Sequence, residues 1–396
     1  MNDWRQAPTE AQIDGLRHTF PTEPYVDVAL TRKMRGRADP PYHPQQLDVV
    51  ATRLRDFLSN RIDERFDIGP LRTLAGGSSK EQFAFDLTRF NAAGAATVER
   101  LVLRLEPPEA TVQTHRLREF QVLGALQGTL PVPAPYWVDP EGLELGQPGL
   151  IYAFCAGSSR PPAGSQASGP QQGYGDHYTR LLAPQFVDRL AEIGTAPWRH
   201  ADMSAFEVPR VGTTDAAIMG IDWWQRVWEE DRPEAVPLMS FTANWLRRNA
   251  PVTDHISIVH GDYRTGNFLF DLDSGEITAL LDWELVRLGD RHEDLTYNMS
   301  PLMGARDASG QLLVGGFYPV EEYLDRYARR SGLPIDLARV RYYTIFSFWR
   351  QVVITYASSH RCVLGRKTHQ DILVGMSAMA AGAVFQSLHD VMKEVF

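Results

Sequence analysis

The sequence contains few cysteines and no long apolar run. Cys155 and Cys362 are its two cysteines in 396 residues, so a disulfide framework is not expected, and nothing resembles a set of zinc ligands. The first residues, MNDWRQAPTE, lack the basic and apolar pattern of a signal peptide. No segment approaches the roughly 20 apolar residues of a membrane span. We therefore expect a soluble cytoplasmic protein without a membrane partner.

The sequence also has no excess of positive charge. It carries 40 Lys and Arg against 49 Asp and Glu, a formal net charge of -9. An acidic surface argues against nucleic acid as the main partner, although a local basic pocket for an anionic substrate is still compatible with it. A hydrophobic content of 43% over this length is enough for two lobes. Nothing in the sequence indicates the oligomeric state.

The hydrophobic patterns divide the chain into three parts. Residues 1–62 form an N-terminal extension, with a short helix near 8–20, an extended arm rich in proline and charge, and an amphipathic helix at 45–62. Residues 63–155 form a small α+β lobe. Two of its predicted strands lie within 71–87 on either side of a Gly-Gly-Ser-Ser turn, and others lie at 100–105 and 150–154; its predicted helix spans 115–126.

Residues 156–396 form the third part, which is mostly helical. It begins with a low-complexity loop at 156–176, AGSSRPPAGSQASGPQQGYGD. The helical patterns cover 177–196, 215–230, 235–249, 320–331, 336–363 and 368–394. A hairpin at 256–283 interrupts them, with a turn at Asp273-Ser274-Gly275.

Two apolar runs end on polar and acidic residues. The first leads into HGDYRTGN, residues 260–267, and the second ends as LLDWE, residues 280–284. Core packing gives no reason for a strand to end on a carboxylate. Phosphoryl transfer does, because it needs one carboxylate to orient an acceptor hydroxyl and oxygen ligands for Mg²⁺. Asp262, Asn267 and Asp282 have the right chemistry and spacing for this reaction.

These motifs resemble those of the aminoglycoside phosphotransferase family, the choline kinase-like small-molecule kinases. Further segments share the resemblance in the same order: GGSSKEQFAF (76–85), LVLRLEPP (101–108), REFQVLGAL (118–126) and GDRHEDLTY (289–297). The similarity spans about residues 70 to 360. It implies a bilobal protein kinase-like fold, with a β-rich N-lobe at 63–155, a helical C-lobe at 156–396, and ATP between the lobes.

The resemblance also implies roles for individual residues. Asp262 is the expected catalytic base, and Arg264 is expected to contact substrate, phosphate or a neighbouring carboxylate. Asn267 and Asp282 are the expected Mg²⁺ ligands. The expected nucleotide-binding residues are Gly76, Gly77, Ser78 and Ser79 of the phosphate loop, the Arg104–Glu119 pair, and the backbone of Ala153 and Cys155 at the hinge.

Several positions depart from the family pattern or allow a simpler interpretation. Arg104 stands where many members carry lysine, and Tyr152-Ala153 stands where many relatives read Met-Glu. The choice between ATP and GTP is therefore open. Taken singly, the glycines could be an ordinary turn, and Arg104 or Glu119 could be solvated surface charges. His260 is expected to have a structural role.

The acceptor is less well specified. The insert at 197–250 contains Trp198, Phe206, Trp223, Trp224, Trp228 and Trp245, which favours either core packing or an apolar, ring-shaped substrate. The run at 229–231 could bind a cationic aminoglycoside or cap a solvated helix. Downstream, Arg350 and Arg361, with His360, Arg366 and Lys367, could bind an anion or lie on a solvated face.

The resemblance is strongest to the kinase-like domains of acyl-CoA dehydrogenase proteins, some of which phosphorylate hydroxyacyl-CoA. Two classes of function follow. The first is an ATP- and Mg²⁺-dependent small-molecule kinase, with antibiotic phosphorylation as a subordinate possibility. The second is a non-catalytic kinase-like module that binds nucleotide.

Overall fold

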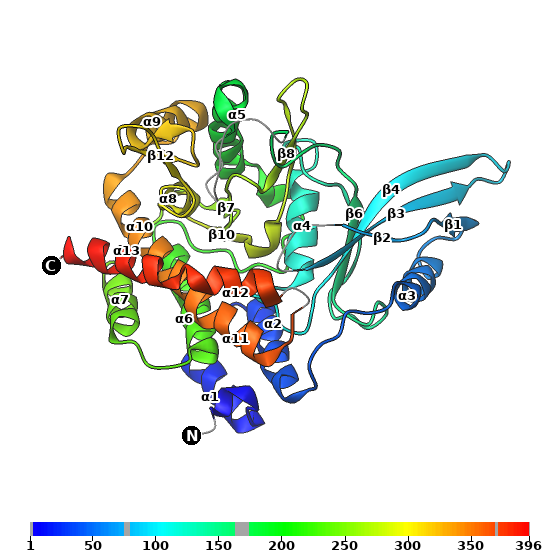
Figure 1. The fold of residues 1–396 in the computed structure, drawn as a ribbon, viewed down its shortest axis with the longest axis horizontal. Coiled ribbons are helices and arrows are strands. Elements are labelled where there is room, and N and C mark those ends of the chain that lie inside the picture. The colour runs from blue at the N-terminus through cyan, green and yellow to red at the C-terminus, as the bar shows by residue number, and fades with distance from the viewer. Residues whose placement is uncertain (1–2, 75–79, 163–173, 369–370, 396) are drawn as a thin grey trace.

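The computed structural model describes residues 3–74, 80–162, 174–368 and 371–395, which form two lobes (Figure 1). The smaller lobe is built on an antiparallel sheet, which projects to the right in Figure 1, and the larger lobe is mostly helical. This arrangement confirms the predicted α+β, bilobal kinase-like fold. Within these four stretches, no helix has the length and apolarity needed to cross a membrane.

The sheet of the N-lobe has the strand order β1-β3-β4-β6-β5, with β2 paired to β3. Its strands are β1 (Phe66–Ile68), β2 (Arg72–Thr73), β3 (Glu81–Phe90), β4 (Ala96–Leu105), β5 (Pro135–Asp139) and β6 (Gly149–Ala153). The long strands β3 and β4 match predicted segments. The short strands β1 and β5 escaped prediction because they are only partly buried and show no clear alternation.

Alternation along β4 places one functional residue in the cleft. Leu101 and Leu103 pack on one face of the sheet with α3 (Leu47–Ser59). Val102 faces the other way and packs with α4 (Arg116–Leu126). Because successive side chains of a strand point to opposite faces, Arg104 lies on the same face as Val102, toward α4 and the larger lobe.

The C-lobe packs its helices around two large apolar clusters. Its helices are α5 (Gly175–Thr195), α6 (Asp215–Asp231), α7 (Pro237–Arg248), α8 (His292–Tyr297), α9 (Val320–Ser331), α10 (Leu337–Val352), α11 (Ser359–Gly365), α12 (Asp371–Met379) and α13 (Ala381–Lys393). A small sheet of β11 (Ala305–Arg306), β12 (Leu312–Val314) and β13 (Tyr318–Pro319) precedes α9. The sequence patterns predicted most of these helices but gave no bounds for the short helix α8.

Four short strands of the C-lobe carry the predicted catalytic segment. β7 (Ser257–Val259) pairs with β10 (Arg287–Gly289), and β8 (Phe268–Phe270) pairs with β9 (Ile277–Leu280). The β8–β9 hairpin confirms the turn predicted at 273–275. All four strands contribute to the core of this lobe, so the loops at their ends are held in place by buried backbone.

The N-terminal segment differs from the prediction of an extended arm. Residues 24–35 form the helix α2 (Pro24–Arg35), which follows α1 (Glu10–Thr19). Pro24 stands in the first turn, where proline fits a helix. The buried Val26, Leu30 and Met34 recur at four-residue spacing, which is a helical pattern. The prediction overlooked this pattern because of the charges that surround it.

The long helix predicted at 336–363 is also interrupted. A π-helical segment, η5 (Val353–Ser358), separates α10 from α11. A π-helix bonds residue i to i+5, so it rotates the following residues away from the 3.6-residue spacing of the α-helix. The eleven-residue spacing of Arg350 and Arg361 would place them near one face of a continuous α-helix. Because η5 lies between them, they do not share a face.

Candidate active site

The loop between β7 and β8 presents Asp262 and fixes both of its carboxylate oxygens. Oδ1 accepts a hydrogen bond from the hydroxyl of Tyr297 at 2.7 Å, and Oδ2 accepts one from Nδ2 of Asn267 at 2.6 Å. Nε of Arg264 lies 3.3 Å from each oxygen. Arg264 thus contacts a neighbouring carboxylate, which is one of the three partners expected for it.

The start of this loop is held by a buried carboxylate on α8. Asp294 accepts hydrogen bonds from the backbone N–H groups of His260 (2.6 Å) and Gly261 (2.9 Å). Burial raises the pKa of Asp294 to about 7, and the neighbouring Glu293 acts in the same direction. The ring of His260 contacts the carbonyl of Leu281 at 3.0 Å, which fits its predicted structural role.

Asn267 and Asp282 lie next to each other at the ends of β8 and β9. The backbone N–H of Leu281 donates to the carbonyl of Asn267 at 2.8 Å, which joins the two loops. Asn267 uses its Nδ2 for Asp262, with one bond to the backbone carbonyl at 2.8 Å and one to the side chain at 2.6 Å. Both contacts use Nδ2, so Oδ1 of Asn267 is left for another partner.

Arg104 of the N-lobe contacts this group of C-lobe residues. Its Nη1 donates to Oε1 of Glu119 on α4 at 2.7 Å, and both side chains are buried. Its Nη2 contacts Asp282 of the C-lobe and lies 3.3 Å from Glu284. Burial acts to raise the pKa of Asp282, but Arg104 outweighs it and holds that pKa below its usual value.

A second buried cation, Lys80, was not predicted. Its Nζ lies 3.0 Å from Glu106 and 3.6 Å from Glu284. Lys80 follows directly on the GGSS turn and Glu284 follows LLDW, so both stand beside motifs that the sequence analysis used. For Glu284 the charge within an apolar run was a usable signal, because such residues are rarely buried without a partner, whereas the polar neighbours of Lys80 gave no such signal. Tyr297, inside GDRHEDLTY, was overlooked in the same way.

Of the two expected parts of the nucleotide site, the structure describes the hinge but not the phosphate loop. Gly76, Gly77, Ser78 and Ser79 lie outside the described residues. At the hinge, the N–H of Ala153 donates to the carbonyl of Ala134 at 2.8 Å, and the N–H of Phe154 donates to Arg100 at 2.9 Å. The Sγ of Cys155 lies 3.7 Å from the carbonyl of Ala153.

Most aromatic side chains of the insert pack in the core, which is one of our two interpretations. Its tryptophans and Phe206 belong to the two apolar clusters of the C-lobe, and Trp245 is the one that is only partly buried. Trp224, for example, is 1% exposed. The simpler interpretation, core packing, therefore accounts for these residues, and they give no support for a ring-shaped acceptor.

The charged runs of the C-lobe are engaged within the protein. Glu230 and Asp231 are buried, and each lies 2.9 Å from Nζ of Lys33. Arg350 is buried against Glu293 at 2.8 Å, and Arg361 donates to the backbone carbonyl of Asp231 at 3.3 Å. Neither a solvated face nor an exposed anion site describes these arginines, although both had been expected as alternatives.

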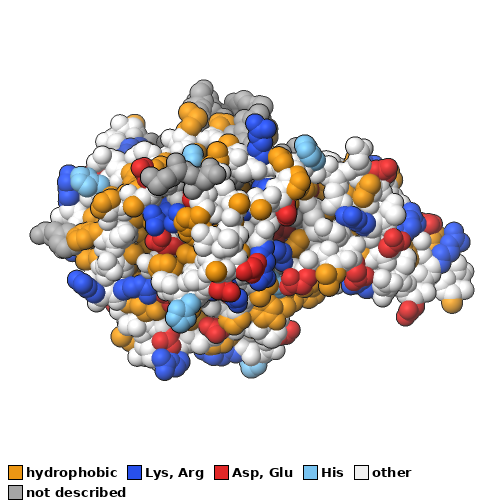
Figure 2. All heavy atoms as spheres, turned by 90° about the horizontal axis from the view of Figure 1, so that it is seen from below, with side chains coloured by type: hydrophobic (Ala, Val, Ile, Leu, Met, Phe, Trp, Pro, Cys, Tyr) orange, Lys and Arg blue, Asp and Glu red, His pale blue; other side chains and the backbone are white. Residues whose placement is uncertain are grey.

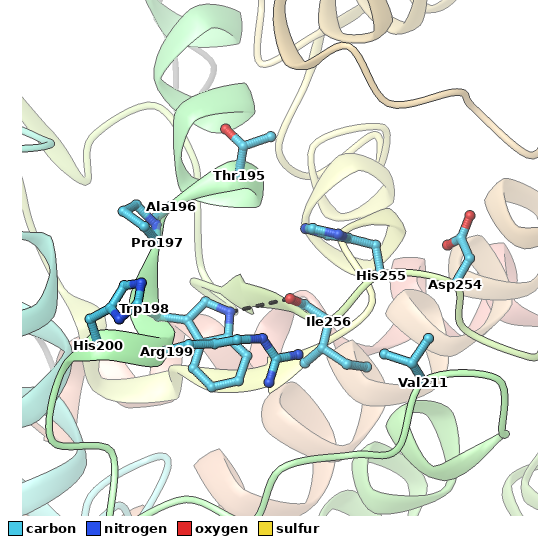
Figure 3. Close-up of a pocket in the computed structure, with 10 residues that line it drawn as sticks. All are labelled: Thr195, Ala196, Pro197, Trp198, Arg199, His200, Val211, Asp254, His255 and Ile256. Carbon is cyan, nitrogen blue, oxygen red and sulfur yellow. Dashed lines mark hydrogen bonds between the residues drawn. The ribbon is translucent and has the colours of Figure 1, made fainter.

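Two hollows on the C-lobe are separate from this cluster. One, of about 310 Å³, is lined by Trp198, Arg199, His200 and His255 among others (Figure 3). It lies at the start of β7, whereas the Asp262 loop follows the end of that strand. The other, of about 500 Å³, is lined by 207–219. Acidic and basic side chains are interspersed over the face in Figure 2, without one dominant charge.

The fold and the cluster define the chain as a kinase-like phosphotransferase. Residues 70–343 match the model of the phosphotransferase enzyme family, and the chain belongs to that family. It is therefore a phosphotransferase by family, as the sequence predicted.

Solved structures share the fold at low sequence identity. A protein of Ralstonia eutropha named as an aminoglycoside phosphotransferase aligns with a TM-score of 0.61 and 21% identity, covering 87% of this chain and 98% of that one. An ethanolamine kinase of Plasmodium vivax aligns with a TM-score of 0.51 and 11% identity, covering 90% and 94%. At these identities the likeness shows the fold.

The similar curated proteins are acyl-CoA dehydrogenase family members. Member 10 of Mus musculus is 26% identical over 67% of this chain and 25% of its own length. Member 11 of Rattus norvegicus is 23% identical over 82% of this chain and 43% of its own length. The chain thus spans between a quarter and less than half of these relatives. The resemblance to this subgroup, predicted from motifs, is confirmed.

Proposed function

We propose that the protein is a kinase that transfers the γ-phosphate of ATP to a hydroxyl group of a small molecule. The observation that carries this proposal is the convergence of Asp262, Asn267 and Asp282 with the Arg104–Glu119 pair of the other lobe. A module that only bound nucleotide would need no carboxylate at the position of Asp262.

Two of these residues fit a magnesium ion by the chemistry of their oxygens. Mg²⁺ prefers carboxylate and amide oxygens. Asn267 directs its amide nitrogen to Asp262, which leaves its oxygen for another partner, and Asp282 holds its carboxylate beside Arg104. Among the described residues, no group of three or more His, Cys, Asp or Glu side chains has metal-binding geometry, so these two would hold the ion together with phosphate oxygens and water. When bound, the ion would neutralise developing phosphate charge.

The protein side of the reaction then follows from the residues. Asp262 would accept a hydrogen bond from the acceptor hydroxyl and take up its proton as the new P–O bond forms and the bond to ADP breaks. Arg104 would bind phosphate oxygens while Glu119 keeps its guanidinium in place. The N–H of Cys155 would bind adenine, because the N–H groups of Ala153 and Phe154 already have backbone partners.

For the acceptor we propose a hydroxyacyl-CoA ester. The support comes from the curated relatives, which are acyl-CoA dehydrogenase family members. Phosphorylation of an aminoglycoside or another antibiotic is the second candidate. The acidic run at 229–231 gives no support for a polycationic acceptor, because Glu230 and Asp231 are buried and paired with Lys33.

The test is ATP consumption with Mg²⁺ across hydroxyacyl-CoA esters, hydroxy acids, choline-like alcohols, aminoglycosides and macrolides. We expect turnover with one class, and its loss in Asp262→Ala with nucleotide affinity retained. Asp273→Ala, at an exposed turn position of the same segment, is the matched control and should keep full activity. If Asp262→Ala is as active as the parent protein, the assignment of the base is wrong. Magnesium-independent nucleotide binding without any turnover would instead favour the non-catalytic module.

A further inference from the structure

The hydroxyl of Tyr297 binds the carboxylate that we assign as the base. Tyr297 is the last residue of α8, and its side chain is 5% exposed. Its hydroxyl donates to Oδ1 of Asp262 at 2.7 Å. A phenol bound to a carboxylate in a buried site cannot exchange that bond for one to bulk water, so the contact fixes where Oδ1 points.

The other donors to Asp262 have further tasks. Asn267 fixes Oδ2 but also carries the oxygen proposed for Mg²⁺. The side chain of Arg264 is 36% exposed, and its Nε lies 3.3 Å from both oxygens of Asp262. Its hydrogen bond is therefore longer than that of Tyr297 and is divided between the two oxygens. Tyr297 is thus the close, buried donor, and its hydroxyl binds Asp262.

The ring of Tyr297 is itself held by a charged pair. The guanidinium of Arg350 on α10 lies 4.7 Å from the centre of the ring, in a cation–π arrangement. Arg350 in turn donates to Glu293 of α8 at 2.8 Å, and both are buried. The chain Glu293–Arg350–Tyr297–Asp262 connects two helices of the C-lobe to the loop.

We propose that Tyr297 is a positioning residue for phosphoryl transfer, a role that rests on the proposed kinase function. It holds Asp262 so that the carboxylate faces the acceptor hydroxyl in line with the γ-phosphate. Tyr297 keeps its own proton throughout, while the acceptor proton passes to Asp262 and the acceptor oxygen replaces ADP on phosphorus. An error of about 1 Å in such a geometry costs roughly 100-fold in rate.

The test compares Tyr297→Phe with Tyr343→Phe. Tyr343 on α10 is fully buried, and its hydroxyl has no hydrogen-bond partner among the described residues, so its loss is the matched control. The assay uses Mg²⁺ and ATP with a hydroxyacyl-CoA ester, and measures transfer to the ester and hydrolysis by water in the same reaction. We expect Tyr297→Phe to lower kcat for transfer roughly 10- to 100-fold, with the Kd for ATP unchanged.

A second readout separates positioning from a general loss of structure. A carboxylate that is free to turn discriminates less well between acceptor and water, so the ratio of hydrolysis to transfer should rise in Tyr297→Phe alone. Tyr297→Gln, which keeps an N–H donor, should recover part of kcat relative to Tyr297→Leu, and this pair applies even where Phe impairs folding. Unchanged kcat and ratio in Tyr297→Phe, or equal activity of Gln and Leu, would overturn the proposal.

The same experiment separates this inference from the function beneath it. Turnover in the parent protein that Asp262→Ala abolishes and Tyr297→Phe leaves intact refutes only the role of Tyr297. An inactive parent protein with the ester alone refutes only the choice of acceptor, whereas an inactive parent protein across the whole acceptor panel refutes the kinase proposal and, with it, the role of Tyr297.

Discussion

Asp282, one of the C-lobe residues that contact the N-lobe, has a strained backbone conformation. Asp282 adopts the left-handed conformation, with φ 66° and ψ 51°. In the described part of the chain, Arg366 is the other non-glycine residue with positive φ. This conformation costs roughly 1–3 kcal/mol and is retained when the surroundings require it, often at functional sites. This conformation lets the carboxylate of Asp282 contact Arg104 beside the loop that carries Asn267.

Replacing Asp282 with asparagine tests its proposed role as a metal ligand. Asparagine tolerates the left-handed backbone, so Asp282→Asn removes the charge with little added strain. We expect the affinity for ATP in the presence of Mg²⁺ to fall roughly tenfold or more, because the carboxylate is the stronger ligand. Titration calorimetry with Mg²⁺ and with EDTA measures it.

The control for this variant is Asp273→Asn at an exposed position of the β8–β9 turn. It should leave both affinities unchanged. Equal Mg²⁺-dependent affinity in Asp282→Asn and the parent protein would remove Asp282 from the metal site, even if activity were lost for another reason.

At the scale of elements, the short helix α8 organises the catalytic loop. Asp294 binds the backbone of His260 and Gly261, Tyr297 binds Asp262, and Glu293 pairs with Arg350 and Arg287. All of these contacts come from fewer than two turns of helix. Changes in α8 should therefore act on catalysis through the loop and not through the nucleotide.

Asp294 gives this element a dependence on pH. Its pKa of about 7 in the folded protein lies above the ordinary value near 4. Between these values the folded state keeps a proton that the unfolded state releases, so the free energy of unfolding falls as pH rises. We expect Tm to fall between pH 5 and pH 8 more steeply in the parent protein than in Asp294→Asn, which cannot titrate there. Parallel slopes for the two proteins would contradict the raised pKa.

The sequence predicted what depends on local pattern and motif, and it missed what depends on long-range contact. The β8–β9 hairpin, the long strands and the motif loops follow from turns and alternation that are visible in a few residues. The burial of Trp224, Arg350 and Glu230 cannot be predicted in this way, because each side chain contacts a partner distant in sequence. The same is true of Tyr297, whose partner lies 35 residues earlier. The helix α2 was visible in the apolar spacing but was hidden by its charges.

At the scale of the whole molecule, the N-terminal segment ties the two lobes together, although it lies outside the residues that match the family model. Arg37 lies between Glu109, which follows β4 of the N-lobe, and Asp231 at the end of α6 in the C-lobe. Glu23 pairs with Arg118 on α4 at 2.9 Å, next to the Glu119 that holds Arg104. Residues 3–45 therefore act as a strap that forms buried ion pairs with both lobes.

The strap should contribute to stability through its buried charges and not through its exposed ones. Arg37→Met keeps most of the side-chain volume but leaves Glu109 and Asp231 without this partner, and breaking such a buried pair costs about 3–5 kcal/mol. Arg35→Met, two residues earlier at the end of α2, removes only an exposed pair with Glu10 and should not shift Tm measurably. Thermal unfolding with and without ATP and Mg²⁺ measures both variants. A large loss in Arg37→Met that nucleotide partly restores would show that the strap and the nucleotide hold the lobes in the same arrangement, whereas equal Tm values for the two variants would show that the segment only covers the surface.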